Sequence, residues 1–484
     1  MSKADDKDEL PDDVDEAQAA DAEEAAELSS SLLDDDDEDA EQSDSINVIP
    51  TATTLDEPIP ALREVRAQLV NVNESSDKEK GDEPETVVLL EDPEGLAPKA
   101  AALSPWAFKL ATLFDGQRSA KDAVKEFEAR YGQGVPAEQA LSLQNELDKA
   151  MFLYSRRFER ALKRHIRGYL DKEVRAAVHA GTSYATDPEA ARETVRGFFS
   201  SPDGPGSLDD LAEGEIGKTH EVLAAMLPHI ELTQGGATYA HGYYELLKKS
   251  QAEVFFILGV AHQALSDGLY YVSTKDFATS LGVLKTNKPI ARRLQTAASV
   301  EGPVAELAHR TEHSVEFQAL LLQVMAEKAK RDVEIVPVLC GSLEQYILQK
   351  VDPLQAPEFV VFTERLRKEL DNCKKKWCVL CSVDMSHVGP EFNHSTMIDE
   401  KLLLPVERGD RRLLKKLEEL DLEGFYNEIF RTENSRHVDA VLAMMTMLKA
   451  TEGLLKKGKL LHYDQLLKNG SHSAVSFASM AFTK

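Results

Sequence analysis

The chain has 484 residues, and its 84 acidic and 56 basic side chains give a formal net charge of −28. Most of this excess is local, because residues 1–50 hold 20 acidic side chains and 2 lysines. No basic domain stands out, which argues against nucleic-acid binding driven by charge. The length suits two folded units once the acidic N-terminal region is set aside.

Membrane insertion and secretion are also disfavoured. No apolar run approaches the roughly 20 residues of a membrane-spanning helix, and the acidic N-terminus is unlike a signal peptide, which is basic and then apolar. The chain has four cysteines, Cys340, Cys373, Cys378 and Cys381, which are too few for a disulfide framework. We therefore expect a cytoplasmic protein in a reducing compartment.

Residues 1–84 are predicted to form a disordered acidic tail. They consist mainly of Asp, Glu, Ala and Ser, with an unbroken acidic run from Asp34 to Asp39. Such a composition cannot bury enough apolar surface to offset the entropy cost of ordering. The tail is either an acidic interaction arm or a solvated extension without a specific partner.

A small helical module is predicted for residues 85–160, followed by a connecting helix over 161–173. Ser104-Pro105, Ser119 and Pro136 mark three helix starts after a short strand. The stretch ALSPWAFKLATLFDGQRSAKDAVKEF resembles the PqqD-like domains, winged-helix-like modules associated with peptide or protein recognition beside radical-SAM systems. This resemblance implies a peptide or radical-SAM protein as partner. DNA binding is disfavoured, because the third helix is mainly acidic.

Residues 174–484 alternate apolar strand candidates with amphipathic helices. The strand candidates are Val222–Leu227, Val254–Leu258, Glu334–Leu339, Trp377–Val383 and Ala474–Phe482. The helices between or beside them are Ala237–Ser250, Glu312–Arg331, Pro357–Asn372 and Val438–Lys456. This alternation predicts an α/β fold with helices on both faces of the sheet, where sites form at the carboxyl ends of strands.

Side chains typical of metal and acid/base sites follow three of these strands. His229 comes after the first strand, His262 after the second, and Asp384 with His387 after the fourth. If the strand ends meet at one edge of the sheet, these groups converge as a metal or acid/base site requires.

Six motifs in this region resemble those of the Memo family, called AmmeMemoRadiSam system protein B in bacteria, in both order and spacing. The motifs are LPHIELTQGG, FILGVAHQAL, TEHSVEFQALLLQ, VEIVPVLCGS, CSVDMSHVGPEF and SAVSFASMAF. The upstream VHAGTSYATDPEAARETVRGFF resembles the first segment of that family, with His179, Gly181 and Tyr184 at matching positions. The resemblance covers about Val174 to Lys484.

The resemblance implies a fold similar to the class III extradiol dioxygenases, whose site binds non-haem iron, whereas Memo proteins are associated with copper and redox chemistry. It places the two metal-binding histidines of the family on His229 and His262. The third ligand of the family, a cysteine, falls on Asn434. A neutral amide oxygen is a weak ligand and lacks the soft thiolate that favours copper. The implied cofactor is one divalent or redox metal ion, iron or copper.

Glu231 is an alternative third ligand. It lies two residues beyond His229, and in an extended segment such residues point the same way. Two imidazoles and one carboxylate would suit Fe(II) better than Cu(I). The other interpretation is that Glu231 is a solvated loop acid and that the pocket no longer binds metal.

Four further residues are candidates for acid/base catalysis: Asp384, His387, His313 and Glu316. An imidazole held by a carboxylate has a fixed tautomer and a pKa near working pH, which suits Asp384 with His387. His313 and Glu316 match the HSxE motif of the family and share one helix face. A hydrogen-bonding role at the helix start is the alternative for this second pair.

Two functions remain open at this point. The first is a metal-dependent oxidoreductase that carries out oxygen-dependent or redox chemistry in a radical-SAM-associated system. The second is a non-catalytic scaffold whose degenerate metal pocket recognises a peptide or protein. Loss of the family's cysteine favours the scaffold, whereas the retained His229 and His262 favour the enzyme.

Overall fold

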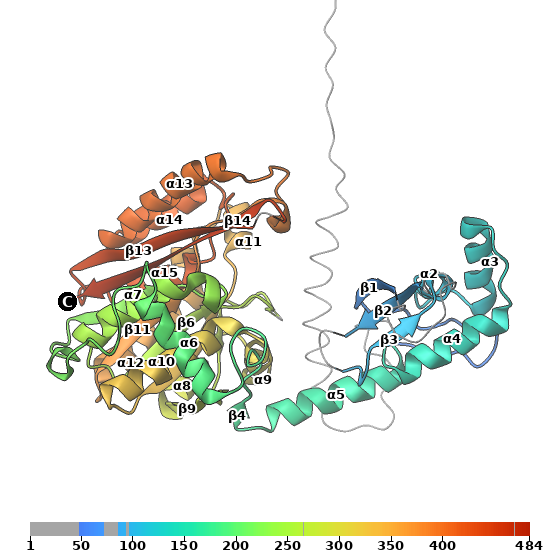
Figure 1. Cartoon of the computed structure of the whole chain (residues 1–484), viewed down its shortest axis with the longest axis horizontal. Coiled ribbons are helices and arrows are strands. Elements are labelled where there is room, and N and C mark those ends of the chain that lie inside the picture. The colour runs from blue at the N-terminus through green and yellow to red at the C-terminus, as the bar shows by residue number, and fades with distance from the viewer. Residues whose placement is uncertain (1–47, 72–85, 93–95, 265, 469) are drawn as a thin grey trace, which may run out of the picture. The chain divides into compact units, whose positions relative to one another are not determined.

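A computed structural model describes residues 48–71, 86–92, 96–264, 266–468 and 470–484 (Figure 1). The chain divides into two compact units, Met1–Asp171 and Lys172–Lys484. Disorder was predicted for residues 1–84, of which 1–47 and 72–84 lie outside the described residues. No helix in the described ranges is long and apolar enough to cross a membrane.

The N-terminal unit combines a small antiparallel sheet with helices. The sheet has the order β1-β2-β3, formed by β1 (Arg66–Asn71), β2 (Thr86–Glu91) and β3 (Ala101–Leu103). The helices that follow are α2 (Pro105–Ala111), α3 (Ala120–Tyr131), α4 (Ala137–Lys149) and α5 (Arg156–Leu170). The predicted cap at Ser119 is confirmed, because its side chain accepts a hydrogen bond from the Asp122 amide.

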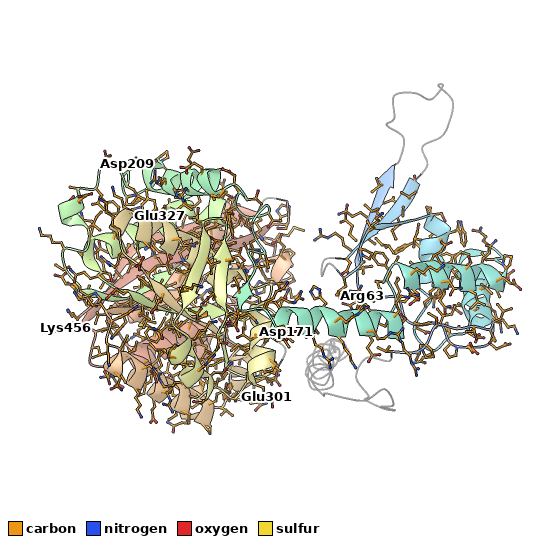
Figure 2. The ribbon with its side chains drawn as sticks, turned by 90° about the horizontal axis from the view of Figure 1, so that it is seen from below. Arg63, Asp171, Asp209, Glu301, Glu327 and Lys456 are labelled. Atoms are coloured by element: carbon orange, nitrogen blue, oxygen red, sulfur yellow. The ribbon has the colours of Figure 1, made fainter. Side chains whose placement is uncertain are left out.

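Two predicted boundaries in this unit are wrong. Residues 48–71 belong to the folded unit rather than to the acidic tail, since Ile59 is fully buried and β1 pairs with β2. Arg63, labelled in Figure 2, forms an ion pair with Asp92 at 3.2 Å. These anchors are hidden when composition is averaged over 84 residues. The predicted border at residue 160 falls inside α5, which begins after the N-cap Ser155.

The C-terminal unit is built on an 11-stranded mixed sheet whose central strands are parallel. Its strand order is β12-β14-β5-β11-β6-β10-β9-β8-β4, with β13 paired to β14 and β7 to β10. The strands are β4 (Val174–Arg175), β5 (Val222–Leu227), β6 (Val254–Val260), β7 (Tyr270–Val272), β8 (Asp276–Thr279), β9 (Gly282–Thr286), β10 (Glu334–Cys340), β11 (Trp377–Ser382), β12 (His387–Val388), β13 (Lys457–Lys468) and β14 (Ser473–Thr483). The five predicted strands are confirmed within one or two residues at each end.

Helices cover both faces of this sheet, as the alternating pattern predicts. One apolar core lies under α6 (Pro188–Ser200), α7 (Leu232–Lys249), α9 (Gly302–His309) and α10 (His313–Ala329). The other lies under α8 (Lys288–Gln295), α11 (Glu344–Leu348), α12 (Pro357–Asn372), α13 (Glu400–Glu418), α14 (Leu422–Arg431) and α15 (Val441–Ala450). The fold is therefore α/β, with a large sheet between two helical layers.

Two helices differ from their predicted ranges. The helix predicted from Ala237 begins at Leu232, and it contains Gly235 and Gly236. A side chain at Gly236 would meet the Phe198 ring at 2.5 Å, so this glycine allows α6 to pack closely on α7. The helix predicted over Val438–Lys456 is shorter, because turns precede Val441 and follow Ala450.

Candidate metal centre

Three histidines converge at the carboxyl-end edge of the large sheet. His229 follows β5 and His262 follows β6, and both strands run parallel to β11 between them. The carboxyl ends of adjacent parallel strands meet at one edge, which brings the two residues together. His313 is the first residue of α10. One ligand atom from each of these histidines lies within 4.8 Å of the others.

The three rings pack directly against one another. The ring centroids of His262 and His313 are 4.9 Å apart in a stacked arrangement, and His229 stands edge-on to both at 4.9 and 5.1 Å. His229 is buried, His313 is partly buried and His262 is exposed. The group is therefore open to solvent on the side of His262.

Glu312, the N-cap of α10, orients two of the rings. Both of its carboxylate oxygens lie 3.1 Å from Nδ1 of His262, and Oε1 lies 3.2 Å from Nδ1 of His313. It also accepts a hydrogen bond from the Ser314 amide at 2.9 Å. With Nδ1 held, Nε2 of each ring is left to face a ligand, as in carboxylate–histidine–metal arrangements.

His229 is fixed by backbone and carboxylate groups. Its Nδ1 lies 2.9 Å from the Ser382 carbonyl oxygen, and its backbone amide donates to Oδ1 of Asp384 at 3.1 Å. Its Nε2 lies 3.0 Å from Oδ2 of Asp439 and 3.7 Å from Oδ2 of Asp384. Hydrogen bonding at Nδ1 fixes the tautomer, so Nε2 is the atom that carries a proton or binds a metal ion.

The carboxylates set the charge of this group. Burial disfavours a charged His229, but Asp439 and Asp384 outweigh it and raise its pKa to about 10. Burial and the charge of His229 lower the pKa of His313 to about 3. Burial would raise the pKa of Glu312, yet its bonds to His262 keep that pKa well below its usual range. The metal-free protein thus holds a proton on His229 where a cation can replace it.

A buried polar network holds the strand ends in place. Nε2 of Gln318 donates to the Pro228 carbonyl and to the Ser382 hydroxyl, each at 2.8 Å. The Ser382 hydroxyl donates in turn to the Ser314 carbonyl at 2.6 Å. These bonds tie the ends of β5 and β11 to the first turn of α10, so they fix the elements that carry His229 and His313.

Glu231 is outside the histidine group, and the side chain of Asn434 is engaged by backbone atoms of its own loop. Glu231 is exposed, because the chain bends at Ile230 and enters α7, which ends the extended geometry on which its prediction depended. Both polar atoms of the Asn434 side chain bond to the backbone of one residue: Oδ1 accepts from the Val438 amide at 3.0 Å and Nδ2 donates to the Val438 carbonyl at 3.1 Å.

The predicted acid/base residues fall in different surroundings. His313 joins the metal-type group, whereas Glu316 is fully buried and receives hydrogen bonds from Arg175, the Val178 and His179 amides, and Tyr184. With these donors Glu316 anchors the segment before α6 to α10, which is the structural alternative. Asp384 is buried beside His229.

His387 is partly buried on β12, at the edge of the same region. Its Nδ1 lies 3.1 Å from the His437 carbonyl oxygen. Its charge influences the pKa of both Asp384 and Asp439. His387 and Asp384 therefore share one electrostatic environment, but no direct hydrogen bond joins them among the described residues.

The sequence interpretation missed two residues of the centre, Glu312 and Asp439. Glu312 directly precedes His313, so the pattern of an acidic N-cap next to a histidine could have indicated it. Asp439 had no such signal, because it lies inside the segment that was predicted as helix. Its place beside His229 comes from contacts between distant parts of the chain.

Comparisons with known proteins point to one family. The model of the family described as Memo-like protein matches residues 175–481. A MEMO1 family protein of Aquifex aeolicus is 27% identical over 398 residues, covering 81% of this chain and 95% of the relative. A MEMO1 family protein of Pyrococcus furiosus is 26% identical over 315 residues, covering 64% of this chain and 99% of the relative. The Aquifex match is longer than the C-terminal unit, so it extends into the N-terminal unit.

Proposed function

Because this chain belongs to the Memo-like protein family, we propose that its C-terminal unit binds one divalent transition-metal ion and is a metal-dependent oxidoreductase. The observation that carries the proposal is the convergence of three imidazoles from three separate elements. Each ring has its Nδ1 held by a carboxylate or a carbonyl, which leaves the three Nε2 atoms to share an ion. Imidazole nitrogens suit iron, copper and zinc.

The donor set favours iron or a similar ion over Cu(I). No cysteine belongs to the histidine group among the described residues, and burial raises the pKa of the thiols of Cys340, Cys378 and Cys381. Cu(I) prefers soft sulfur ligands, whereas nitrogen and oxygen donors suit harder ions. A bound iron ion would supply oxygen-dependent or redox chemistry at this position.

The protein residues around the centre orient it and hold protons. Glu312 and Ser382 orient the imidazoles, and Asp384 positions His229 through its backbone amide. His387 is the group that we assign to proton transfer. Its side chain is partly exposed to solvent, and its Nδ1 contacts the His437 carbonyl oxygen. The other ring nitrogen, Nε2, is therefore left to face a substrate.

Elemental analysis of protein purified without added metal tests the proposal. We expect about one metal ion per chain, lost in His229→Ala and His262→Ala. His241→Ala is the matched control, because His241 stacks on His462 and is outside the histidine group. Wild-type protein that stays empty after anaerobic reconstitution with Fe(II) would contradict the proposal, as would metal retained in both pocket variants.

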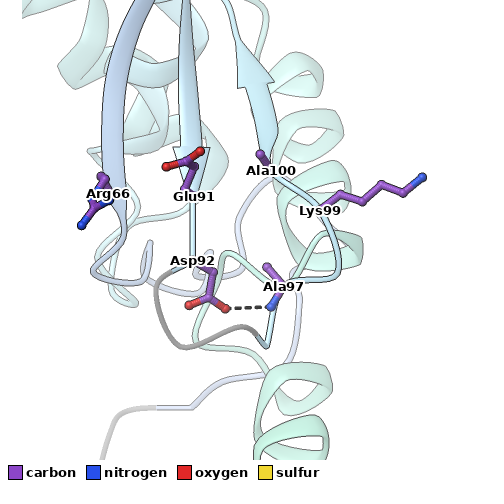
Figure 3. A pocket seen from close by; sticks show the side chains of 6 residues that line it. All are labelled: Arg66, Glu91, Asp92, Ala97, Lys99 and Ala100. Atoms are coloured by element: carbon purple, nitrogen blue, oxygen red, sulfur yellow. Dashed lines mark hydrogen bonds between the residues drawn. The ribbon is translucent and has the colours of Figure 1, made fainter. Parts of the chain in front are cut away.

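A second function, recognition of a peptide from a radical-SAM system, is favoured by a pocket in the N-terminal unit. The pocket has a volume of about 310 Å³ and is lined by Arg66, Glu91, Asp92, Ala97, Lys99 and Ala100 (Figure 3). Asp92 shapes its floor by accepting hydrogen bonds from the Ala97 and Leu96 amides at 2.7 and 2.9 Å. The remaining charges of both signs suit a peptide backbone with polar side chains.

Co-purification tests this second function. A radical-SAM protein encoded beside this chain should be retained by the wild type and lost from the double variant Arg66→Glu with Lys99→Glu. Lys125→Glu, an exposed charge reversal on α3 of the same unit, is the control. Equal retention by all three proteins, or by none of them, would count against a peptide role for the pocket.

A further inference from the structure

Asp439 carries a carboxylate oxygen that the three-imidazole centre leaves unexplained. Its Oδ1 accepts a hydrogen bond from the Asp384 amide at 2.8 Å. Its Oδ2 is buried and has no satisfactory hydrogen bond among the described residues, although it lies 3.0 Å from Nε2 of His229. The contact with the His229 imidazole lacks hydrogen-bond geometry, so this buried carboxylate oxygen is under-satisfied, and such atoms usually indicate an unseen partner.

The distance between these two atoms fits two ligands of one ion. Metal–nitrogen and metal–oxygen bonds are about 2.1 Å long, so donors at right angles around the ion are about 3.0 Å apart. We propose that Oδ2 of Asp439 is a ligand of the metal ion beside Nε2 of His229, and that Asn434 is a positioning residue that presents this carboxylate. The inference rests on the proposed metal site and adds to it a carboxylate ligand.

Asn434 suits the positioning role because its amide closes a tight loop immediately before Asp439. Its two hydrogen bonds hold the backbone N–H and C=O of Val438, the residue directly before Asp439. The loop contains three non-glycine residues with positive φ, at Glu433 (49°), Asn434 (46°) and His437 (45°). Such conformations are unfavourable for most side chains and persist only where surrounding contacts hold them. The Asn434 side chain supplies two of those contacts.

The resulting donor set changes which metal ion is preferred. Three imidazoles with one carboxylate are harder than a set that includes a thiolate, so Fe(II), Co(II) or Zn(II) should be preferred over Cu(I). Position 439 would thus supply the oxygen ligand, while position 434 orders the loop that carries it.

Titration with Co(II) alone tests the assignment of Asp439. The full chain, freed of metal, is compared with Asp439→Asn by visible absorption, since the cobalt bands report the ligands and their geometry. We expect the Co(II) affinity of Asp439→Asn to fall on the order of 100-fold, which is the upper end of the loss seen when a residue that hydrogen-bonds a metal ligand is removed. We also expect the absorption bands to shift. The matched control is Glu433→Gln, which removes an exposed carboxylate from the same loop. Unchanged affinity and bands in Asp439→Asn would overturn the proposal.

The variant Asn434→Ala separates positioning from ligation. A positioning residue should lower the Co(II) affinity about tenfold and leave the absorption bands of the saturated protein unchanged. If the bands shift as they do in Asp439→Asn, Asn434 is itself a ligand, and the assignment of its role is wrong. Asn434→Asp keeps the acceptor for the Val438 amide and should recover part of the affinity.

Two further measurements keep the outcomes distinct. If Asp439→Asn fails to fold, as judged by the melting temperature of the metal-free protein, Asp439→Glu replaces it, because that variant keeps the carboxylate and should shift the bands without abolishing binding. Wild-type protein that binds no Co(II) overturns both the metal site and this inference. Wild-type binding that is lost in His262→Ala and kept in Asp439→Asn overturns only this inference.

Discussion

Glu312 and Glu316 lie about one helical turn apart at the start of α10, and both side chains are buried. Glu316 accepts hydrogen bonds from Arg175, Tyr184 and two backbone amides. We call Glu316 with Arg175 and the groups that Arg175 contacts the closed cluster, because the protein itself supplies all of these partners. Glu312 instead holds Nδ1 of His262 and of His313, and no described residue forms a hydrogen bond with Nε2 of either ring.

This difference separates a structural carboxylate from one that supports a site. A buried carboxylate whose partners are all hydrogen-bond donors of the protein itself stabilises the fold. Where the partner is an imidazole, orienting one nitrogen presents the other nitrogen to a ligand. Glu316 therefore connects two parts of the chain, and Glu312 prepares ligand atoms.

Removing the charge of Glu316 from the closed cluster should cause the largest loss of folding stability. Glu316→Gln leaves the fully buried Arg175 guanidinium without its counter-charge, and we expect the free energy of unfolding to fall by about 3–5 kcal/mol. Glu327→Gln is the control on the same helix, because its ion pair with Arg192 is on the surface and should contribute under about 1 kcal/mol. Urea unfolding of both variants measures the difference. Equal losses would show that the Arg175–Glu316 pair is not a structural anchor.

The imidazole of the closed cluster should make stability depend on pH. His309 is fully buried, its carbonyl oxygen accepts from Arg175, and burial lowers its pKa to about 4. The unfolded chain binds this proton more readily, with a pKa of about 6.5, so the contribution is complete above that pH and is lost as the pH falls towards 4. The loss should be on the order of 3 kcal/mol.

The variant His309→Gln isolates this contribution. It removes the titrating group and keeps a donor for the Tyr271 carbonyl, which Nε2 of His309 contacts at 3.0 Å. We expect its free energy of unfolding to vary less between pH 6.5 and 4 than that of the wild type. Parallel pH profiles for the two proteins would show that His309 does not titrate in this range.

The open carboxylate should affect ligand binding more than folding. Glu312→Gln keeps an acceptor for the Ser314 amide but weakens the hold on His262 and His313. We expect metal affinity to fall about 10- to 100-fold, or about 1.4–2.7 kcal/mol, as measured by Co(II) titration. Glu301→Gln at the start of α9 is the control, since its side chain makes no cap hydrogen bond. Affinity equal to the control would remove the distinction between Glu312 and Glu316.

The sequence predicted the parts of this fold that local pattern determines. The strand Val222–Leu227 and the helix Pro357–Asn372 occur as predicted, because uniform apolar runs and proline starts are local signals. His229 and His262 were identified because each directly follows a strand, and parallel strand ends meet at one edge. The resemblance to the Memo family was confirmed by the match over residues 175–481.

The rest of the centre depends on contacts that no local pattern encodes. Asp439 reaches His229 only because the loop after α14 brings it there from a distant part of the chain. The side chain of Asn434 forms hydrogen bonds with backbone atoms of the same loop. Glu231 was predicted from an extended geometry that ends at the start of α7. The anchors in residues 48–71 were overlooked because acidic neighbours dominate their composition.

The position of β11 between β5 and β6 has a consequence for synthesis of the chain. The Ser382 carbonyl that orients His229 follows it by 153 residues, so both histidine-bearing strands leave the ribosome well before the strand that separates them. Pairing across such separations is slow, and domains generally fold as units. We expect the nascent chain to capture no ion at this edge until nearly all of it has emerged. Metal occupancy would then mark chains that have completed folding.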